Sequence, residues 1–107
     1  MSWTVETLNE TVDSEVAALP DDMRARLARI AKLIKEKGLD RVGESHVKHI
    51  EARLWEMRLT GRSGISRALY VTAVGRRVVI VRVFVKKTEK TPRREIELAL
   101  ARAKLVE

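Results

Sequence analysis

The stretch Val78–Arg94, VVIVRVFVKKTEKTPRR, combines a β-strand, a basic cluster and the start of a helix. Side chains alternate between the faces of a strand, so the four valines at odd positions from 79 to 85 share one face, which we expect to be core. The other face carries Arg82 and Lys86 among apolar neighbours, which is unusual for a central strand. Thr91-Pro92 then predicts an N-cap and the first position of a helix over 92–104.

Outward from this stretch, turn signals and apolar periodicity predict the remaining elements. A buried stripe at Met23, Leu27, Ile30 and Ile34 predicts a helix that follows Pro20 and stops at Gly38. Residues 39–47 read as a loop, and the spacing of Thr7 and Glu10 is that of a capping box. The other expected elements are a short strand at Trp3–Glu6, a helix at Leu8–Leu19, and strands at Arg53–Thr60 and Arg67–Val74 joined by a hairpin connection at Gly61–Gly64.

The resulting order, β-α-α-β-β-β-α, predicts an α+β fold in one domain over residues 1–107. We expect a mainly antiparallel four-stranded sheet with the helices packed on one face. The other face is then open, and strand alternation assigns to it Glu56, Arg58, Arg82 and Lys86.

Composition excludes several classes of protein. The chain has no cysteine, so disulfides, zinc–thiolate sites and thiol nucleophiles are excluded. No apolar run approaches the ~18 residues needed to span a bilayer, and no signal peptide is evident. We therefore expect a cytoplasmic protein that does not bind membranes.

The charge is divided along the chain. All 22 lysines and arginines lie after residue 22, whereas six of the 15 acidic residues lie before residue 23. The first segment therefore carries −6, and the remainder, with 22 basic and nine acidic residues, carries +13. This separation predicts a polyanionic partner, nucleic acid before membrane. The alternative is that the second and third helices simply have solvated basic faces.

Three segments together resemble a known family. VFVKKTEKTPRREIELA (Val83–Ala99) is similar to the C-terminal signature of small RelE-like toxins of bacterial toxin–antitoxin modules, in particular their HigB-type, phage-related branch. LWEMRL (Leu54–Leu59) and SRALY (Ser66–Tyr70) resemble the paired middle strands of that family. With the helix opening at Leu19-Pro20, the resemblance covers most of the chain in the right order.

The resemblance implies a RelE-like fold and a type II toxin, a ribosome-dependent endoribonuclease that cuts mRNA and inhibits translation. The implied partners are a cognate antitoxin of the helix-turn-helix type, the ribosome and its mRNA, with operator DNA reached only through the antitoxin. Such a reaction needs a base for the RNA 2′-hydroxyl, cations for the phosphorane-like charge and an acid for the departing 5′-oxygen. No metal or other cofactor is expected, because arginine and lysine can supply the positive charge.

Site residues are carried over by position. Arg58 and Arg67 match basic strand positions of the family and are expected to clamp the scissile phosphate. Lys86 and Lys87 match its basic pair and are the expected proton-transfer residues, since like charges from Arg82, Lys87 and Lys90 should lower the pKa of Lys86. RNA-binding roles are expected for Arg82, Lys90, Lys48, Arg93 and Arg94.

The sequence also departs from the family. Some relatives end with a catalytic tyrosine on the last helix, where this chain has Arg93 and Arg94. The single tyrosine, Tyr70, is expected to pack beneath the sheet. His46 and His49 could serve proton transfer or bind a metal, or could simply be exposed. The identity of the general base therefore stays open.

Two other functions fit the same fold. One is a ParE-like toxin that poisons DNA gyrase by binding, although that relative generally lacks a cluster of basic residues on the strands. The other is a non-catalytic nucleic-acid-binding module. The few aromatic residues argue against a platform that stacks single-stranded bases.

Overall fold

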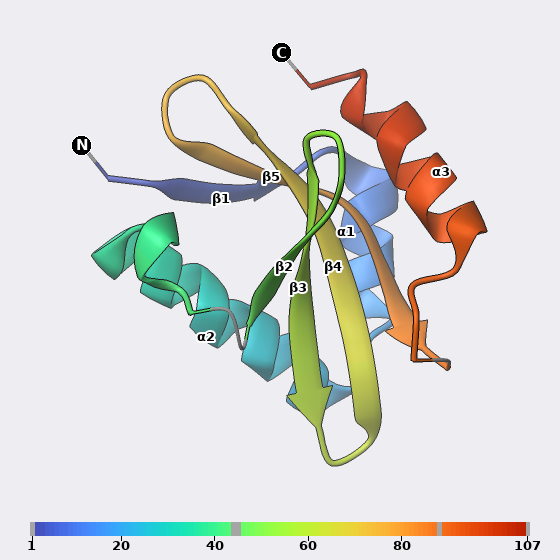
Figure 1. Cartoon of the computed structure of the whole chain (residues 1–107). Coiled ribbons are helices and arrows are strands. Elements are labelled where there is room, and N and C mark those ends of the chain that lie inside the picture. The colour runs from blue at the N-terminus through green and yellow to red at the C-terminus, as the bar shows by residue number, and fades with distance from the viewer. Residues whose placement is uncertain (1, 44–45, 88, 107) are drawn as a thin grey trace.

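The computed structural model describes residues 2–43, 46–87 and 89–106 of the chain. Its strands are β1 (Thr4–Thr7), β2 (Val47–Glu51), β3 (Leu54–Gly61), β4 (Gly64–Ala73) and β5 (Arg77–Lys86). They form one sheet in the order β1-β5-β4-β3-β2, with β1 and β2 at its edges (Figure 1). β1 runs parallel to β5, and the other pairings are antiparallel. The α+β, mainly antiparallel prediction is confirmed.

The expected count of four strands is wrong, because β2 is a fifth strand. It begins at Val47, the last residue of the predicted loop, and the rest of that loop contains a short 3-10 helix, η1 (Leu39–Arg41). β2 pairs only with β3, and its register is broken by a bulge between His49 and Glu51. A short, irregular edge strand with an exposed lysine and histidine has too little apolar alternation to be predicted from sequence.

The helices are α1 (Glu10–Ala17), α2 (Asp21–Lys37) and α3 (Arg93–Ala103). The predicted apolar stripe of α2 is buried, and Gly38 ends this helix at φ 93°. The cap of α1 is Asn9, whose side chain accepts from the Val12 amide at 3.1 Å, because Thr7 is still part of β1. No helix in the described ranges is long and apolar enough to cross a bilayer.

Helices cover both faces of the sheet, contrary to the expectation of one covered face. α1 and α2 pack on one face against a core that includes Met57, Leu59 and Tyr70. α3 packs on the other face, where Ala99 and Ala103 contact a second core. Figure 1 shows α3 and α2 on opposite sides of the molecule. α3 therefore covers part of the sheet face that the sequence predicts to be open.

A β-bulge in β5 explains why its valines do not share one face. Leu69 pairs with Arg82 but Tyr70 pairs with Ile80, so Val81 has no partner in β4. The extra residue shifts the alternation. Val78, Ile80 and Val83 therefore face α1 and α2, whereas Val79 and Val81 lie in the core beneath α3. The predicted all-valine core face is wrong.

Candidate active site

Two arginines lie directly opposite each other in the middle of the sheet. Arg58 of β3 pairs in register with Arg67 of β4, and strand alternation places both on the α3 face. Like charges opposite each other destabilise a sheet. Arg67 is nevertheless only 6% exposed. The fold thus holds two guanidinium groups together, although their mutual repulsion and the loss of hydration both oppose this arrangement.

Buried donor atoms of both arginines make no hydrogen bond in the part of the chain that the structure describes. The Nε atoms of Arg58 and Arg67, and Nη1 of Arg67, are buried without a hydrogen bond within the described residues. Burial is the main cause that lowers the pKa of the Arg67 guanidinium, and the charge of Arg58 lowers it further, against the opposing effect of Glu56. Buried donors without a partner are rare and costly in native proteins. These donors are therefore not used by hydrogen bonds within the described residues.

Glu56 is the acidic residue among these cations, and its side chain is nearly inaccessible at 3% exposure of the residue. Its Oε1 lies 3.3 Å from Arg67 Nη1, and its Oε2 accepts a hydrogen bond from the Thr91 hydroxyl at 2.7 Å. The sequence placed Glu56 on this face but assigned it no role. The sequence feature that could have indicated a role is the position of Glu56. It lies two residues before Arg58 in the same strand and therefore on the same face of the sheet.

Lys86 completes the group at the end of β5. It is partly buried, and no carboxylate of the described residues forms an ion pair with it. Burial is the largest cause that lowers the pKa of Lys86, and the charges of Arg67 and Arg58 lower it further, against Glu56 and Glu89. The predicted direction is confirmed, but the predicted source, Arg82, Lys87 and Lys90, is not. We refer to Arg58, Arg67 and Lys86 as the cation cluster.

The other predicted catalytic residue, Lys87, lies at the rim. It is exposed just beyond β5 and lines an open hollow with Gly64, Ile65, Lys86 and Glu89. The structure therefore brings Arg58, Arg67 and Lys86 together and leaves Lys87 beside them rather than among them.

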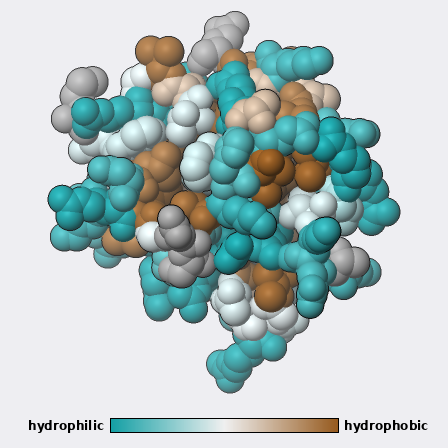
Figure 2. Space-filling model, viewed as in Figure 1, coloured by the Kyte–Doolittle hydropathy of each residue, from teal (hydrophilic) through white to brown (hydrophobic). Residues whose placement is uncertain are grey.

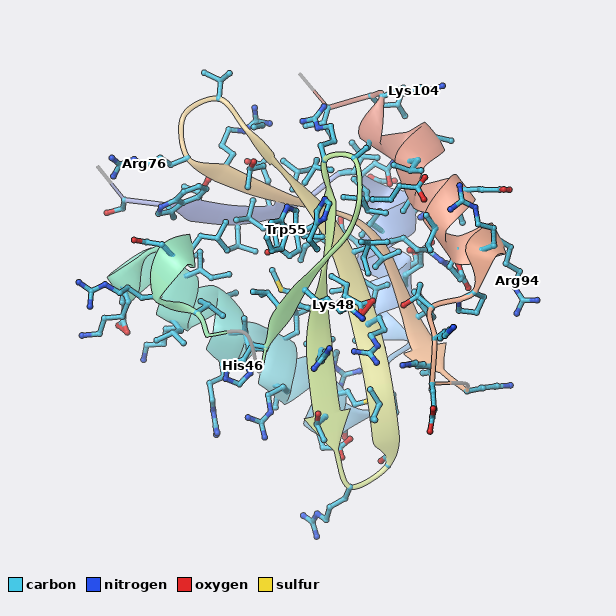
Figure 3. The ribbon with its side chains drawn as sticks, in the orientation of Figure 1. His46, Lys48, Trp55, Arg76, Arg94 and Lys104 are labelled. Carbon is cyan, nitrogen blue, oxygen red and sulfur yellow. The ribbon has the colours of Figure 1, made fainter. Side chains whose placement is uncertain are left out.

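The predicted RNA-binding residues separate into two groups. Lys48 is exposed on the cluster's face, in register with Glu56, and Lys90 is exposed in the segment before α3. By contrast, Arg93 forms ion pairs with Glu51 and Glu97, and Arg94 projects away from the sheet (Figure 3).

Arg82 is the clearest departure from expectation. Its Nη1 lies 2.8 Å from Glu15 of α1, and its Nε lies 2.7 Å from Glu95 of α3. The same Glu15 binds Arg102 of α3. The β5 bulge aims Arg82 into this network, so we leave Arg82 out of the candidate RNA interface.

The histidines and the tyrosine have different surroundings. His46 accepts a hydrogen bond at its backbone oxygen from the Arg58 amide, so it continues the β2–β3 register beside the cluster. His49 stacks against Trp55 on the other face, which separates the two histidines. Tyr70 is buried as predicted, and burial raises its pKa to about 12. No group of three histidine, aspartate or glutamate residues that could hold a metal occurs within the described ranges.

An apolar hollow of about 370 Å³ lies elsewhere, between β1, η1 and the β2–β3 pair. It is lined mainly by apolar side chains, among them Trp3, Val42, Val47 and Trp55. Figure 2 shows apolar atoms between β1, α2 and β2 with hydrophilic side chains around them. It contains no cluster of charged groups, so we place the chemistry at the cation cluster.

Comparisons with known proteins identify the family and the fold of the chain. The family model described as "Phage derived protein Gp49-like (DUF891)" matches residues 14–104. A chain in the crystal structure of the archaeal RelE–RelB complex from Pyrococcus horikoshii OT3 is similar in fold, with a TM-score of 0.58 and 19% sequence identity. The similarity covers 81% of this chain and 98% of that one. A search of curated proteins found no significant match in sequence.

Proposed function

The chain belongs to the phage-derived Gp49-like family and has a RelE-like fold, and from this premise we propose that it is the toxin of a type II toxin–antitoxin module. Its proposed activity is cleavage of mRNA on the ribosome without a metal ion, which would inhibit translation in the cytoplasm. The carrying observation is a half-buried and a buried arginine side by side, Arg58 and Arg67, with buried donor atoms that make no hydrogen bond within the described residues. A phosphodiester supplies the acceptors and charge that these groups lack.

In the proposed reaction, the RNA 2′-oxygen attacks the neighbouring phosphorus, and the bond from phosphorus to the 5′-oxygen breaks. Arg58 and Arg67 bind the non-bridging oxygens, whose negative charge grows in the transition state. The proton of the 2′-hydroxyl passes to a base, and a proton is delivered to the departing 5′-oxygen. The products are a 2′,3′-cyclic phosphate and a free 5′-hydroxyl.

Lys86 is the proposed base. Its lowered pKa increases the fraction of neutral amine at a given pH, and a neutral amine accepts a proton. Lys87 at the rim is the second candidate for proton transfer. Lys48, Lys90 and Arg94 are proposed to contact the RNA backbone electrostatically, because they are exposed outside the cluster.

The proposed partners are the ribosome with its mRNA and an antitoxin. The structural neighbour was crystallised as a RelE–RelB complex, and this supports a cognate antitoxin for this chain. We propose that the antitoxin is a helix-turn-helix protein that binds operator DNA, and that the toxin contacts this DNA only through the antitoxin. A ParE-like action on gyrase is less favoured, since the cation cluster suits phosphate chemistry rather than binding alone.

The test is mRNA cleavage in a translation extract. The native chain should cut ribosome-bound mRNA, and Arg67→Ala should lower the cleavage rate by about 100-fold or more, as loss of a preorganised donor does. Lys32→Ala, which removes an exposed cation from α2, is the matched control and should remain active. Gyrase-linked DNA breaks without mRNA cleavage would instead establish the ParE-like function.

A further inference from the structure

The two oxygens of the buried Glu56 carboxylate have different partners. Oε2 accepts a hydrogen bond from the Thr91 hydroxyl at 2.7 Å, whereas Oε1 faces Arg67 Nη1 at 3.3 Å. That second contact lies within ion-pair distance, yet Arg67 Nη1 makes no hydrogen bond. Glu56 therefore balances part of the cluster's charge without occupying the Arg67 donors.

This arrangement is unusual for an arginine and a carboxylate at such close range. Such pairs usually form two parallel hydrogen bonds, which are strong when they are buried. A bidentate pair here would occupy Arg67 and leave less of it for an RNA phosphate. Within the described residues, the hydrogen bond that the Glu56 carboxylate accepts comes from Thr91.

Thr91 lies in the segment between β5 and α3, where the sequence predicts that it caps the helix. The structure uses it differently: Pro92 is the N-cap residue, and no side chain caps α3. The Thr91 hydroxyl instead donates to Glu56 of β3, 35 residues earlier in the chain. No described side chain caps α3, and the Thr91 hydroxyl instead holds the Glu56 carboxylate of the site.

We propose that Thr91 is a positioning residue that holds Glu56 away from Arg67 and so keeps the Arg67 guanidinium open for a substrate phosphate. The identity of that phosphate as RNA rests on the proposed function. Without the hydroxyl, the Glu56 carboxylate turns toward Arg67, forms the bidentate pair and closes the phosphate site. Loss of the Glu56 charge removes the competitor, with or without Thr91.

The test compares the native chain with T91V, T91S, E56Q and the double variant T91V/E56Q. Valine matches threonine in shape but cannot donate, and serine keeps the hydroxyl. The probe is a single-stranded RNA oligonucleotide that carries 2′-O-methyl groups at every position and cannot be cleaved. Its affinity is measured by titration at constant salt, because phosphate binding depends strongly on salt.

We expect T91V to weaken binding by about tenfold, the effect of one charge-assisted contact. T91S should bind like the native chain. The double variant should recover the affinity of E56Q, because glutamine cannot form the closing ion pair. A double variant that binds as weakly as T91V would show that the hydroxyl matters for another reason, and native-like binding by T91V would overturn the proposal.

A second readout does not depend on RNA. The ¹⁵N resonances of the Arg67 guanidinium in the free protein should shift in T91V toward a hydrogen-bonded state and return in T91V/E56Q. If the native chain neither binds nor cleaves RNA, the proposed function fails while these resonances still decide the role of Thr91. If they do not move in T91V, the role fails while the nuclease proposal stands.

Discussion

Arg58 illustrates at the scale of one residue how a functional group can oppose stability. Its guanidinium faces Arg67 across the β3–β4 pair and has a buried donor without a partner. We predict that Arg58→Met raises the free energy of unfolding by about 1 kcal/mol, because it removes a like-charge pair and an unsatisfied donor. Urea denaturation of the two proteins measures the difference.

The same variant should cleave mRNA far more slowly, since the phosphate loses one of its two clamps. Thr60→Met, an exposed position two residues further along β3, controls for the new side chain and should not stabilise the fold. A stable Arg58→Met protein with native activity would remove Arg58 from the site. A destabilised one would show that Arg58 has a structural partner after all.

Lys86 gives a prediction for pH dependence. Its folded-state pKa is lowered, so the folded chain releases this proton at a lower pH than the unfolded chain. Stability that depends on Lys86 therefore rises with pH from the folded pKa up to the ordinary lysine value. If the neutral amine is the base, the single-turnover cleavage rate rises with pH up to the folded-state pKa of Lys86 and levels off above it.

Lys86→Arg separates the two roles of this lysine. Arginine keeps the positive charge but does not lose its proton in the accessible range. We expect the rise of cleavage rate with pH to vanish in this variant, while RNA affinity at pH 7 stays within about threefold of native, since phosphate contacts are mainly electrostatic. An unchanged pH profile would assign the base to another group, with Lys87 and His46 as the next residues to test.

At the residue scale, the sequence predicts correctly those side-chain orientations that follow directly from strand alternation. Arg58 and Arg67 face the same side because their strands pair in the predicted hairpin. The role of Glu56 was not predictable, because it depends on a hydroxyl donated from Thr91, 35 residues away. Thr91 itself suggested a helix cap, and only the tertiary structure directs its hydroxyl elsewhere.

At the scale of elements, the β5 bulge decides which basic residues reach the site. Strict alternation places Arg82 on the same face of the strand as Lys86. Nothing in the segment VVIVRVF indicates that Val81 is the extra residue of a bulge. The bulge and the surrounding carboxylates turn Arg82 into a link between α1 and α3. β2 was missed for a similar reason, since its pairing with β3, rather than its own sequence, makes it a strand.

The network around Arg82 should therefore stabilise α3 rather than bind RNA. Arg82→Met leaves Glu15 and Glu95 largely buried with fewer partners, and we predict a loss of about 2–3 kcal/mol in the free energy of unfolding. Hydrogen exchange should become faster in α3 than in α2, because α3 loses the Glu95 contact. RNA affinity should change less than it does for Arg67→Met. A large loss of RNA affinity in a stable Arg82→Met protein would restore Arg82 to the interface.

At the scale of the whole molecule, three acidic residues of the first segment form ion pairs with basic residues of the same chain. Glu6 binds Arg77, Glu15 binds Arg82 and Arg102, and Asp21 binds Arg24. The acids thus neutralise cations in β5, α2 and α3 and leave the cation cluster without an ion pair at Arg58 or Lys86 among the described residues. The charge division seen in the sequence therefore becomes a spatial one, with the unbalanced positive charge on the proposed RNA face and on α2.

The salt dependence of RNA binding tests which of these two surfaces carries the contact. The affinity for a short single-stranded RNA should fall as salt rises, and each lost phosphate contact should reduce the slope of log affinity against log salt by about 0.7. Lys86→Met should show this reduction, whereas Lys32→Met on the outer face of α2 should keep the native slope. Equal reductions in both variants would mean that RNA lies over the whole basic surface, because a specific site counts only the cations that it contacts. In that case the buried donors of Arg58 and Arg67 that make no hydrogen bond within the described residues would need another ligand.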